Sequence, residues 1–300
     1  MHIDPYIVLG SAVVGLLVGM TGAGGGALMT PMLILLFGVT PAAAISSDLV
    51  ASVVMRPIGA VVHLRAGTVN RRLVLLLASG SVPAAILGSY LLSVMGNSPS
   101  DVKRIEVVLG VALLVGTAAI VLRFALDRRS GGRRNDVIHA VTPRPLLTVL
   151  IGIVGGVMVG LTSVGSGSLM VILLLFVYPR ISAKQLVGTD LTQAVLLTCA
   201  AAVGALLFGH VEFGLTSSLI IGSAPAVYIG SMLSSRVPDR YIRPVMAFVI
   251  LASGLKYVGL STTALAWTML GVLLAGIAFI AYELQGRRER RPVLSSSLVE

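Results

Sequence analysis

Long apolar segments follow one another along nearly the whole 300-residue chain. Each reaches the roughly 18 residues that an α-helix needs to cross the hydrocarbon core of a bilayer. Charged residues make up only 11% of the chain, whereas soluble domains carry about a quarter. We therefore expect an all-α, polytopic transmembrane bundle. The apolar segments are residues 6–38, 42–64, 73–95, 105–124, 145–178, 185–209, 214–234, 241–259 and 263–283.

Basic residues outnumber acidic residues and leave the chain with a formal net charge of +10. Most of them lie in short segments between the apolar ones. This distribution is the one that orients membrane proteins in the bilayer. It therefore gives no support to a nucleic-acid partner.

Reactive side chains are few and scattered. Cys199 is the only cysteine, which excludes an intramolecular disulfide and a thiolate metal site. No nucleophile–base pair or phosphate-binding loop occurs, and the four histidines lack the spacing of metal ligands: His2, His63, His139 and His210. We therefore expect that the protein is not an enzyme and has no catalytic residues, metal or cofactor.

A glycine-rich interruption occurs twice, in GMTGAGGGALM (residues 19–29) and GLTSVGSGSLM (residues 160–170). Residue 19 matches residue 160 and, after one inserted residue, residue 48 matches residue 190, so the offset grows from 141 to 142. At the second offset GSVPAAILGSYL (80–91) matches GSAPAVYIGSML (222–233). A register that is kept over this length predicts an internal duplication.

The duplication sets the expected domain boundaries. Residues 1–124 and 144–260 should form two membrane repeats, joined by an Arg- and Gly-rich cytoplasmic linker at residues 125–143. Residues 261–285 should form an additional transmembrane helix. Residues 286–300 form a basic tail, which we expect to be disordered and cytoplasmic.

The arginines predict that the two repeats cross the membrane in opposite directions. Positively charged loops stay in the cytoplasm, which places the linker, the tail and the loop with Arg65, Arg71 and Arg72 on that side. The equivalent loop of the second repeat, residues 210–214, has no Lys or Arg. Equivalent loops on opposite faces of the inner (plasma) membrane indicate an inverted-topology repeat.

This orientation requires residues 145–178 to cross the membrane an even number of times. Their length suits two partial helices that are joined at the glycines, as in a re-entrant hairpin. Lys103 and Arg104 do not fit the scheme, because it places them near the outer face.

Each glycine interruption predicts a broken helix, which a membrane tolerates only where protein or a water-filled cavity surrounds it. The half-helix after the break directs free N–H groups and the positive end of its dipole at whatever lies there, which suits an anion. Two breaks predict a paired substrate site; the alternative is that the glycines only let helices pack closely. The expected site residues are Thr21, Gly22, Gly24, Gly25 and Gly26 at the first break and Thr162, Ser163, Gly165, Ser166, Gly167 and Ser168 at the second.

Charged side chains inside the apolar segments are further candidates, because ionised groups are costly in hydrocarbon. Asp48 and Asp190 occupy equivalent positions, and either relay protons or cap nearby helix N-termini. Arg56 either binds an anionic substrate through its planar fork or forms a structural ion pair with Asp48. Its equivalent is Thr198, and Gln193 is the polar residue on that side. We expect Arg56 and Gln193 to bind substrate and the two aspartates to couple transport to protons.

Several of these stretches together resemble the sulfite exporter TauE/SafE family. They are GMTGAGGGALMTPML, SSDL, HLRAGTVN and GSVPAAILGSYL in the first repeat and GTDL, GHVEFG and GSAPAVYIGSML in the second, and the likeness covers about residues 8–260. The resemblance implies a polytopic transporter of sulfite, sulfoacetate or other organosulfonates. Family members usually have a Ser-like residue where this chain has Asp48 and Asp190, and this difference motivates the proton-coupling hypothesis.

The expected function is secondary transport of a small anion, with H+ as the coupling ion. The substrate would be held near mid-membrane between the paired breaks, with alternating access from one unit moving against another. The lipid bilayer is the other expected partner, and the sequence leaves open whether the chain forms a homodimer. Two alternatives remain: a passive anion channel, and a non-transporting membrane scaffold or assembly protein.

Overall fold

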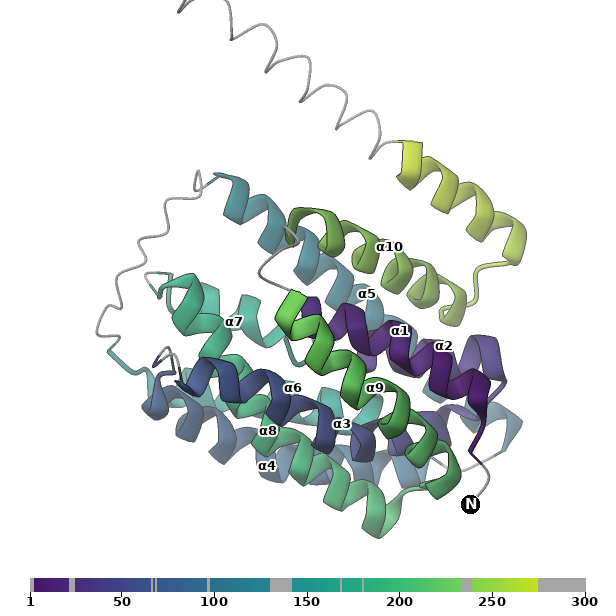
Figure 1. Cartoon of the computed structure of the whole chain (residues 1–300), viewed down its shortest axis with the longest axis horizontal. Helices are drawn as coiled ribbons and strands as arrows, with labels where there is room; N and C mark the ends of the chain where they lie inside the picture. Colours follow the sequence, from purple (N-terminus) through teal and green to yellow (C-terminus); the bar gives the residue numbers. More distant parts are fainter. Residues whose placement is uncertain are drawn as a thin grey trace, which may run out of the picture. The chain divides into compact units, whose positions relative to one another are not determined.

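The computed structural model describes residues 3–21, 25–65, 67, 69–95, 98–129, 142–167, 169–179, 181–233 and 239–274. Every regular element in these residues is an α-helix (Figure 1), as the apolar segments predicted. Within this part of the chain, five helices are long and apolar enough to cross a membrane, so the protein is a multi-pass membrane protein. They span Arg71–Val94, Pro99–Leu122, Pro145–Thr162, Gln185–Phe208 and Phe213–Leu233.

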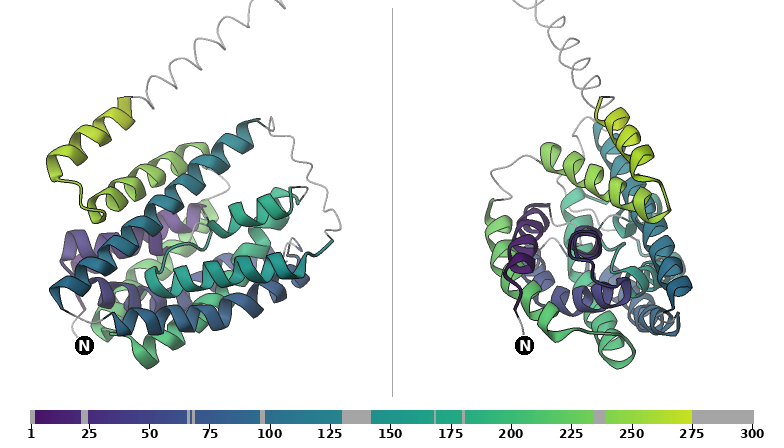
Figure 2. Two further views of the ribbon diagram at one scale, coloured as in Figure 1. Left: turned by 180° about the vertical axis from the view of Figure 1, so that it is seen from behind. Right: turned by 90° about the vertical axis from the view of Figure 1, so that its right-hand side faces the viewer.

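The chain divides into two compact units, Met1–Val258 and Gly259–Glu300. The second unit contains the helix Thr262–Leu274 in its described part. The helices of the first unit lie side by side as a bundle (Figure 2). In chain order they are α1 (Pro5–Thr21), α2 (Gly26–Phe37), α3 (Pro41–Arg65), α4 (Arg71–Val94), α5 (Pro99–Arg129), α6 (Pro145–Thr162), α7 (Leu169–Val177), α8 (Ala183–Phe208), α9 (Phe213–Leu233) and α10 (Asp239–Tyr257).

Some boundaries differ from the expected domains or fall outside the described residues. α5 continues to Arg129, past the expected end of the first repeat at residue 124. The helix therefore includes the first part of the expected arginine-rich linker. The linker residues 130–141 lie outside the described part of the chain, and so do residues 275–300, which include the predicted tail.

Both glycine-interrupted segments are split into two helices, α1 with α2 and α6 with α7. α2 has 12 residues and α7 has 9, which makes them about 18 Å and about 13 Å long. The hydrocarbon core of a bilayer is about 30 Å thick. Each second half-helix is therefore too short to cross it.

The first helix of each repeat packs tightly on the fourth helix of the other repeat, α1 on α9 and α6 on α4. A Cβ atom on Gly19 of α1 would lie 2.3 Å from the carbonyl oxygen of Val227, and one on Gly160 of α6 would lie 2.2 Å from that of Ala85. Only glycine allows two backbones to approach this closely. Gly19 is equivalent to Gly160, and Val227 is equivalent to Ala85. The same close helix contact therefore occurs twice.

The third helices of the two repeats, α3 and α8, pack on each other and run in opposite directions. The backbone N–H of Asn70, just after α3, donates a 3.1 Å hydrogen bond to Oγ1 of Thr189 near the start of α8. The backbone N–H of Glu212, just after α8, donates a 3.2 Å hydrogen bond to Oγ of Ser47 near the start of α3. Asn70 is equivalent to Glu212, and Ser47 is equivalent to Thr189. The same hydrogen bond therefore occurs at both ends of the helix pair.

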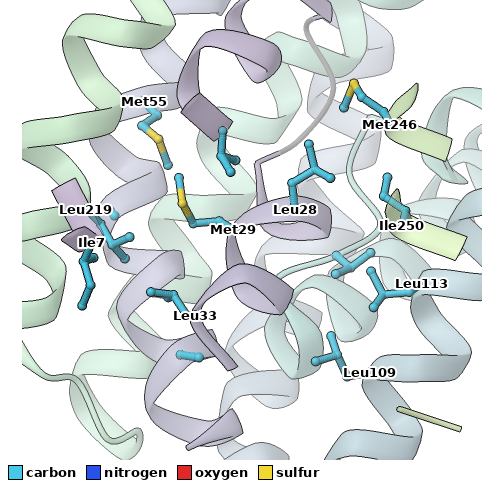
Figure 3. Packing of buried hydrophobic residues seen from close by; sticks show 14 of the residues in the cluster. Ile7, Leu28, Met29, Leu33, Met55, Leu109, Leu113, Leu219, Met246 and Ile250 are labelled. Atoms are coloured by element: carbon cyan, nitrogen blue, oxygen red, sulfur yellow. The ribbon is translucent and has the colours of Figure 1, made fainter. Parts of the chain in front are cut away.

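The first part of α2 lies among other helices, whereas Leu35 and Leu36 near its end are exposed. Its residues Leu28, Met29 and Leu33 are buried. They belong to a cluster to which five further helices contribute (Figure 3), through Ile7, Met55, Leu109, Leu113, Leu219, Met246 and Ile250. A half-helix whose first residues are surrounded by protein in this way can begin within the membrane without exposing its polar groups to lipid.

Candidate substrate site at the contact of the two breaks

The two breaks touch each other. Gly26, the first residue of α2, lies against Ser163, the residue that follows α6. A Cβ atom on Gly26 would lie 1.9 Å from the carbonyl oxygen of Ser163, a distance that no side chain can occupy. The two breaks therefore lie against each other, and glycine is the residue that permits this contact.

The backbone between α6 and α7 has an unusual conformation. Ser163 has a φ of 58°, in the left-handed region, and Gly165 and Gly167 have φ values of 119° and 91°. The N–H of Ser163 closes α6 through a 2.7 Å bond to Val159. A serine in the left-handed region is strained relative to glycine, and such residues concentrate at functional sites.

The predicted threonines stabilise the first half-helices. The hydroxyl of Thr21 donates to the carbonyl of Leu17 at 2.8 Å, and that of Thr162 donates to Met158 at 2.7 Å. Both bonds reach back four residues in the same helix. The hydroxyl hydrogens of these two residues are therefore used within α1 and α6.

Asp48 connects three segments through a single carboxylate oxygen. Ser163 Oγ donates to Asp48 Oδ2 at 2.6 Å, and Thr30 Oγ1 of α2 donates to the same oxygen at 3.3 Å. Asp48 is fully buried, and its other oxygen, Oδ1, has no hydrogen-bond partner among the described residues. These contacts with other helices distinguish Asp48 from an exposed acid that caps a helix end.

Arg56, two turns further along α3, supplies a buried positive charge. Its side chain is only 9% exposed, and its guanidinium interacts electrostatically with the carboxylates of Asp48 and Asp190. Its Nε and Nη2 atoms are buried and make no hydrogen bond in the part of the chain that the structure describes. The ion pair found among the described residues joins Arg104 and Asp101, so Arg56 does not form the close ion pair with Asp48 that was the alternative, and part of its guanidinium fork is unused.

The corresponding positions on α8 differ from those on α3. Asp190 is buried, as is its equivalent Asp48. Thr198, at the position equivalent to Arg56, uses its hydroxyl in a 2.7 Å bond to Ala194 of its own helix. Gln193 donates through Nε2 to Ser81 Oγ of α4 at 2.6 Å, so it ties α8 to α4. The polar groups at equivalent positions of α3 and α8 thus have different partners.

The remaining predicted residues divide into three groups. Gly25 and Ser166 are buried near the breaks, and Ser166 Oγ has no hydrogen-bond partner among the described residues. Gly165 and Gly167 are needed for their positive φ. Three lie outside the described residues: Gly22, Gly24 and Ser168.

Thr30 was not predicted from the sequence, although it contacts Asp48. The available signal was a hydroxyl within an apolar half-helix, four residues after the last glycine of the break. The described residues contain no group of three His, Cys, Asp or Glu side chains that could hold a metal ion.

Comparisons with known proteins agree with this architecture. The family model described as "Sulfite exporter TauE/SafE" matches residues 7–257. The Bacillus subtilis (strain 168) "Probable membrane transporter protein YjnA" is 41% identical over 253 residues, which cover 84% of this chain and 98% of that protein. YdhB and YunE, two further probable membrane transporter proteins of B. subtilis, are 22% and 24% identical over 83% and 84% of this chain and 98% and 97% of their own. No solved structure gives a significant match.

Proposed function

This chain belongs to the sulfite exporter TauE/SafE family, and from that premise we propose that it is a secondary transporter of small sulfur-containing anions, such as sulfite and organosulfonates. The substrate binds where the two breaks meet, next to Arg56. Transport is coupled to protons through Asp48 and Asp190.

The observation that carries the proposal is the unused part of the Arg56 guanidinium. Nε and Nη2 are buried without a hydrogen-bond partner among the described residues. A buried neutral donor without a hydrogen-bond partner destabilises a protein by about 1–3 kcal/mol, and a charged donor destabilises it by more. The planar fork of arginine fits the oxygens of a sulfonate or sulfite. An anion bound here would satisfy both nitrogens.

Helix ends at the breaks add to this anion site. The N–H groups of Leu28, Met29 and Met170 bind the carbonyls of Gly25 and Gly165, and the N–H groups before them in α2 and α7 have no acceptor within their own helices. The positive ends of the two helix dipoles lie at the same breaks. Ser163, which contacts Gly26 at the start of α2, holds the second break beside the first.

The directions of the helices support the inverted arrangement of the two repeats. The equivalent helices α3 and α8 are antiparallel, and α2 and α7 are too short to span a bilayer. We place the arginine-rich linker and the C-terminal tail in the cytoplasm and the protein in the inner membrane, because positively charged segments stay on that side.

Proton coupling follows from competition for Arg56. Its guanidinium interacts with the carboxylates of Asp48 and Asp190, and a substrate anion needs the same group. Two ionised aspartates therefore oppose anion binding, and protonation of one of them favours binding while the other can stay ionised. Because Asp48 also binds Ser163 and Thr30, its protonation state is linked to the arrangement of the breaks.

Flux through reconstituted vesicles tests the proposal. We expect saturable uptake of labelled sulfite that increases when a proton gradient is imposed. A passive channel would give flux that does not respond to that gradient. A scaffold protein would give no flux above empty vesicles.

The Asp48→Asn and Asp190→Asn variants test the coupling separately. If these residues couple transport to protons, each variant loses the response to the gradient while it still binds anion. Transport with unchanged pH dependence in both variants would rule out coupling by these residues and leave the anion site in place.

A further inference from the structure

We propose that the site selects a substrate with a single negative charge and its own hydrogen-bond donor, such as a hydroxyalkyl- or aminoalkyl-sulfonate or hydrogen sulfite, over a dianion. This inference rests on the proposed function and specifies its substrate class. It comes from Asp48, which binds Ser163 at the contact of the breaks, and from Arg56, which lies two turns further along α3.

These two residues leave opposite kinds of polar atoms unsatisfied. Arg56 offers two donors, Nε and Nη2, and Asp48 offers an acceptor, Oδ1; all three atoms are buried without a partner among the described residues. Buried polar groups are almost always paired in native structures. A ligand that only accepts hydrogen bonds would satisfy Arg56 and leave Oδ1 unpaired. A ligand that also donates one satisfies both residues.

Asp48 Oδ1 is held ready as an acceptor. The other oxygen of the carboxylate, Oδ2, accepts from Ser163 at 2.6 Å and from Thr30 at 3.3 Å. These donors come from α2 and from the end of α6, so they fix the orientation of the carboxylate. An acceptor that is already oriented loses little entropy when a ligand donates to it.

The charges near Arg56 also disfavour a dianion. The single positive charge of Arg56 interacts with two carboxylates, those of Asp48 and Asp190. The N-termini of α2 and α7 add about half a positive charge each, which brings the region close to neutrality. A monoanion adds one negative charge to this region, and a dianion adds two in a low-dielectric environment.

Three ligands of similar size separate these effects. Ethanesulfonate is a monoanion without a donor, 2-hydroxyethanesulfonate adds one hydroxyl, and sulfoacetate has a carboxylate in place of the hydroxyl-bearing end and is therefore a dianion. Dissociation constants would be measured by calorimetric titration of the purified full-length protein, at a pH where every sulfonate and carboxylate ligand is ionised. We expect 2-hydroxyethanesulfonate to bind roughly tenfold more tightly than ethanesulfonate, from one hydrogen bond to a charged group. Sulfoacetate should bind more weakly than either.

Asp48→Asn replaces the hydrogen-bond acceptor that faces the ligand with a donor. Ser163 and Thr30 are donors, so they should hold the amide oxygen and direct the NH2 group towards the substrate. The variant should lose its preference for the hydroxyl and gain affinity for sulfoacetate. Asp101→Asn is the control, because it removes a carboxylate on α5 that binds Arg104 and Ser98 and lies outside the site; its ligand order should match the wild type.

The outcomes distinguish this inference from the function on which it rests. Equal affinity of the wild type for ethanesulfonate and 2-hydroxyethanesulfonate, or tighter binding of sulfoacetate, would overturn the selectivity while the anion site stands. The absence of binding by all three ligands, and by sulfite, would overturn the proposed function and this inference with it. The wild-type comparison decides the question even if Asp48→Asn does not fold.

Discussion

Ser163, which follows α6, donates a 2.6 Å hydrogen bond to Oδ2 of Asp48 on α3, and thereby joins the break of one repeat to the buried acid of the other. The same serine is in the left-handed region and lies against Gly26. A single residue therefore determines the conformation of the second break, its contact with the first break and the orientation of the carboxylate.

Replacing Ser163 by alanine or glycine should separate these roles. Both substitutions remove a hydrogen bond to a buried carboxylate, worth about 1.5–3 kcal/mol if the carboxylate is ionised. Alanine also keeps a Cβ in the left-handed region, which costs about 1 kcal/mol relative to glycine. In thermal unfolding we expect Ser163→Ala to be less stable than Ser163→Gly. Equal stability of the two variants would mean that the backbone at residue 163 is not strained.

Gly26→Ala should be much more damaging than Gly25→Ala. A Cβ atom at residue 26 would overlap the Ser163 backbone, whereas one at residue 25 would meet Met55 at an ordinary 3.7 Å. We expect Gly26→Ala to cost at least about 1–3 kcal/mol by overpacking and to abolish transport. Gly25→Ala should stay within about 1 kcal/mol of the wild type. Normal flux through the Gly26→Ala protein would show that the breaks need not touch.

Arg56→Lys tests whether the fork of the guanidinium matters or only its charge. Lysine keeps the positive charge next to Asp48 and Asp190 but cannot bind two oxygens in one plane. We expect sulfonate affinity to fall about tenfold or more, with a smaller loss of stability than in Arg56→Ala. Titration calorimetry and thermal unfolding report the two quantities. Wild-type affinity in Arg56→Ala would remove Arg56 from the site.

The hydrogen bonds of Ser47 and Thr189 lie at opposite ends of the α3–α8 pair. Ser47→Ala and Thr189→Ala should each lower stability by about 1 kcal/mol, whereas Thr189→Ser keeps the hydroxyl and should stay near the wild type. If the ends open towards opposite sides of the membrane, the two alanine variants should change the half-saturation concentration on opposite faces of oriented vesicles. A change on the same face in both variants would contradict that assignment.

Much of this architecture could be predicted because it repeats along the sequence. The matching registers predicted the duplication, the two glycine clusters located the breaks, and the cost of charge in hydrocarbon directed attention to Asp48 and Arg56. The contact of Ser163 with Asp48 could not be predicted, because it joins residues 115 positions apart and depends on how helices from different repeats pack.

Local competition for hydrogen bonds explains other differences. Thr21 and Thr162 have the residue type expected of anion ligands, but the carbonyls four residues earlier in their own helices accept their hydroxyl hydrogens. Such back-bonding depends on the side-chain rotamer, which the spacing of residues does not reveal. Gly19 and Gly160 serve the close packing of helices that was the alternative explanation for the glycines.

The contacts of α1 with α9 and of α6 with α4 determine when the fold can be completed during synthesis. α1 leaves the ribosome before α9, yet the backbone on which its Gly19 packs belongs to Val227 of α9. The first repeat must therefore wait in the bilayer, with a glycine-lined face open, until most of the second has been made. Cutting the chain between the repeats would separate each first helix from its partner, so the two halves should regain the fold only when they are present together.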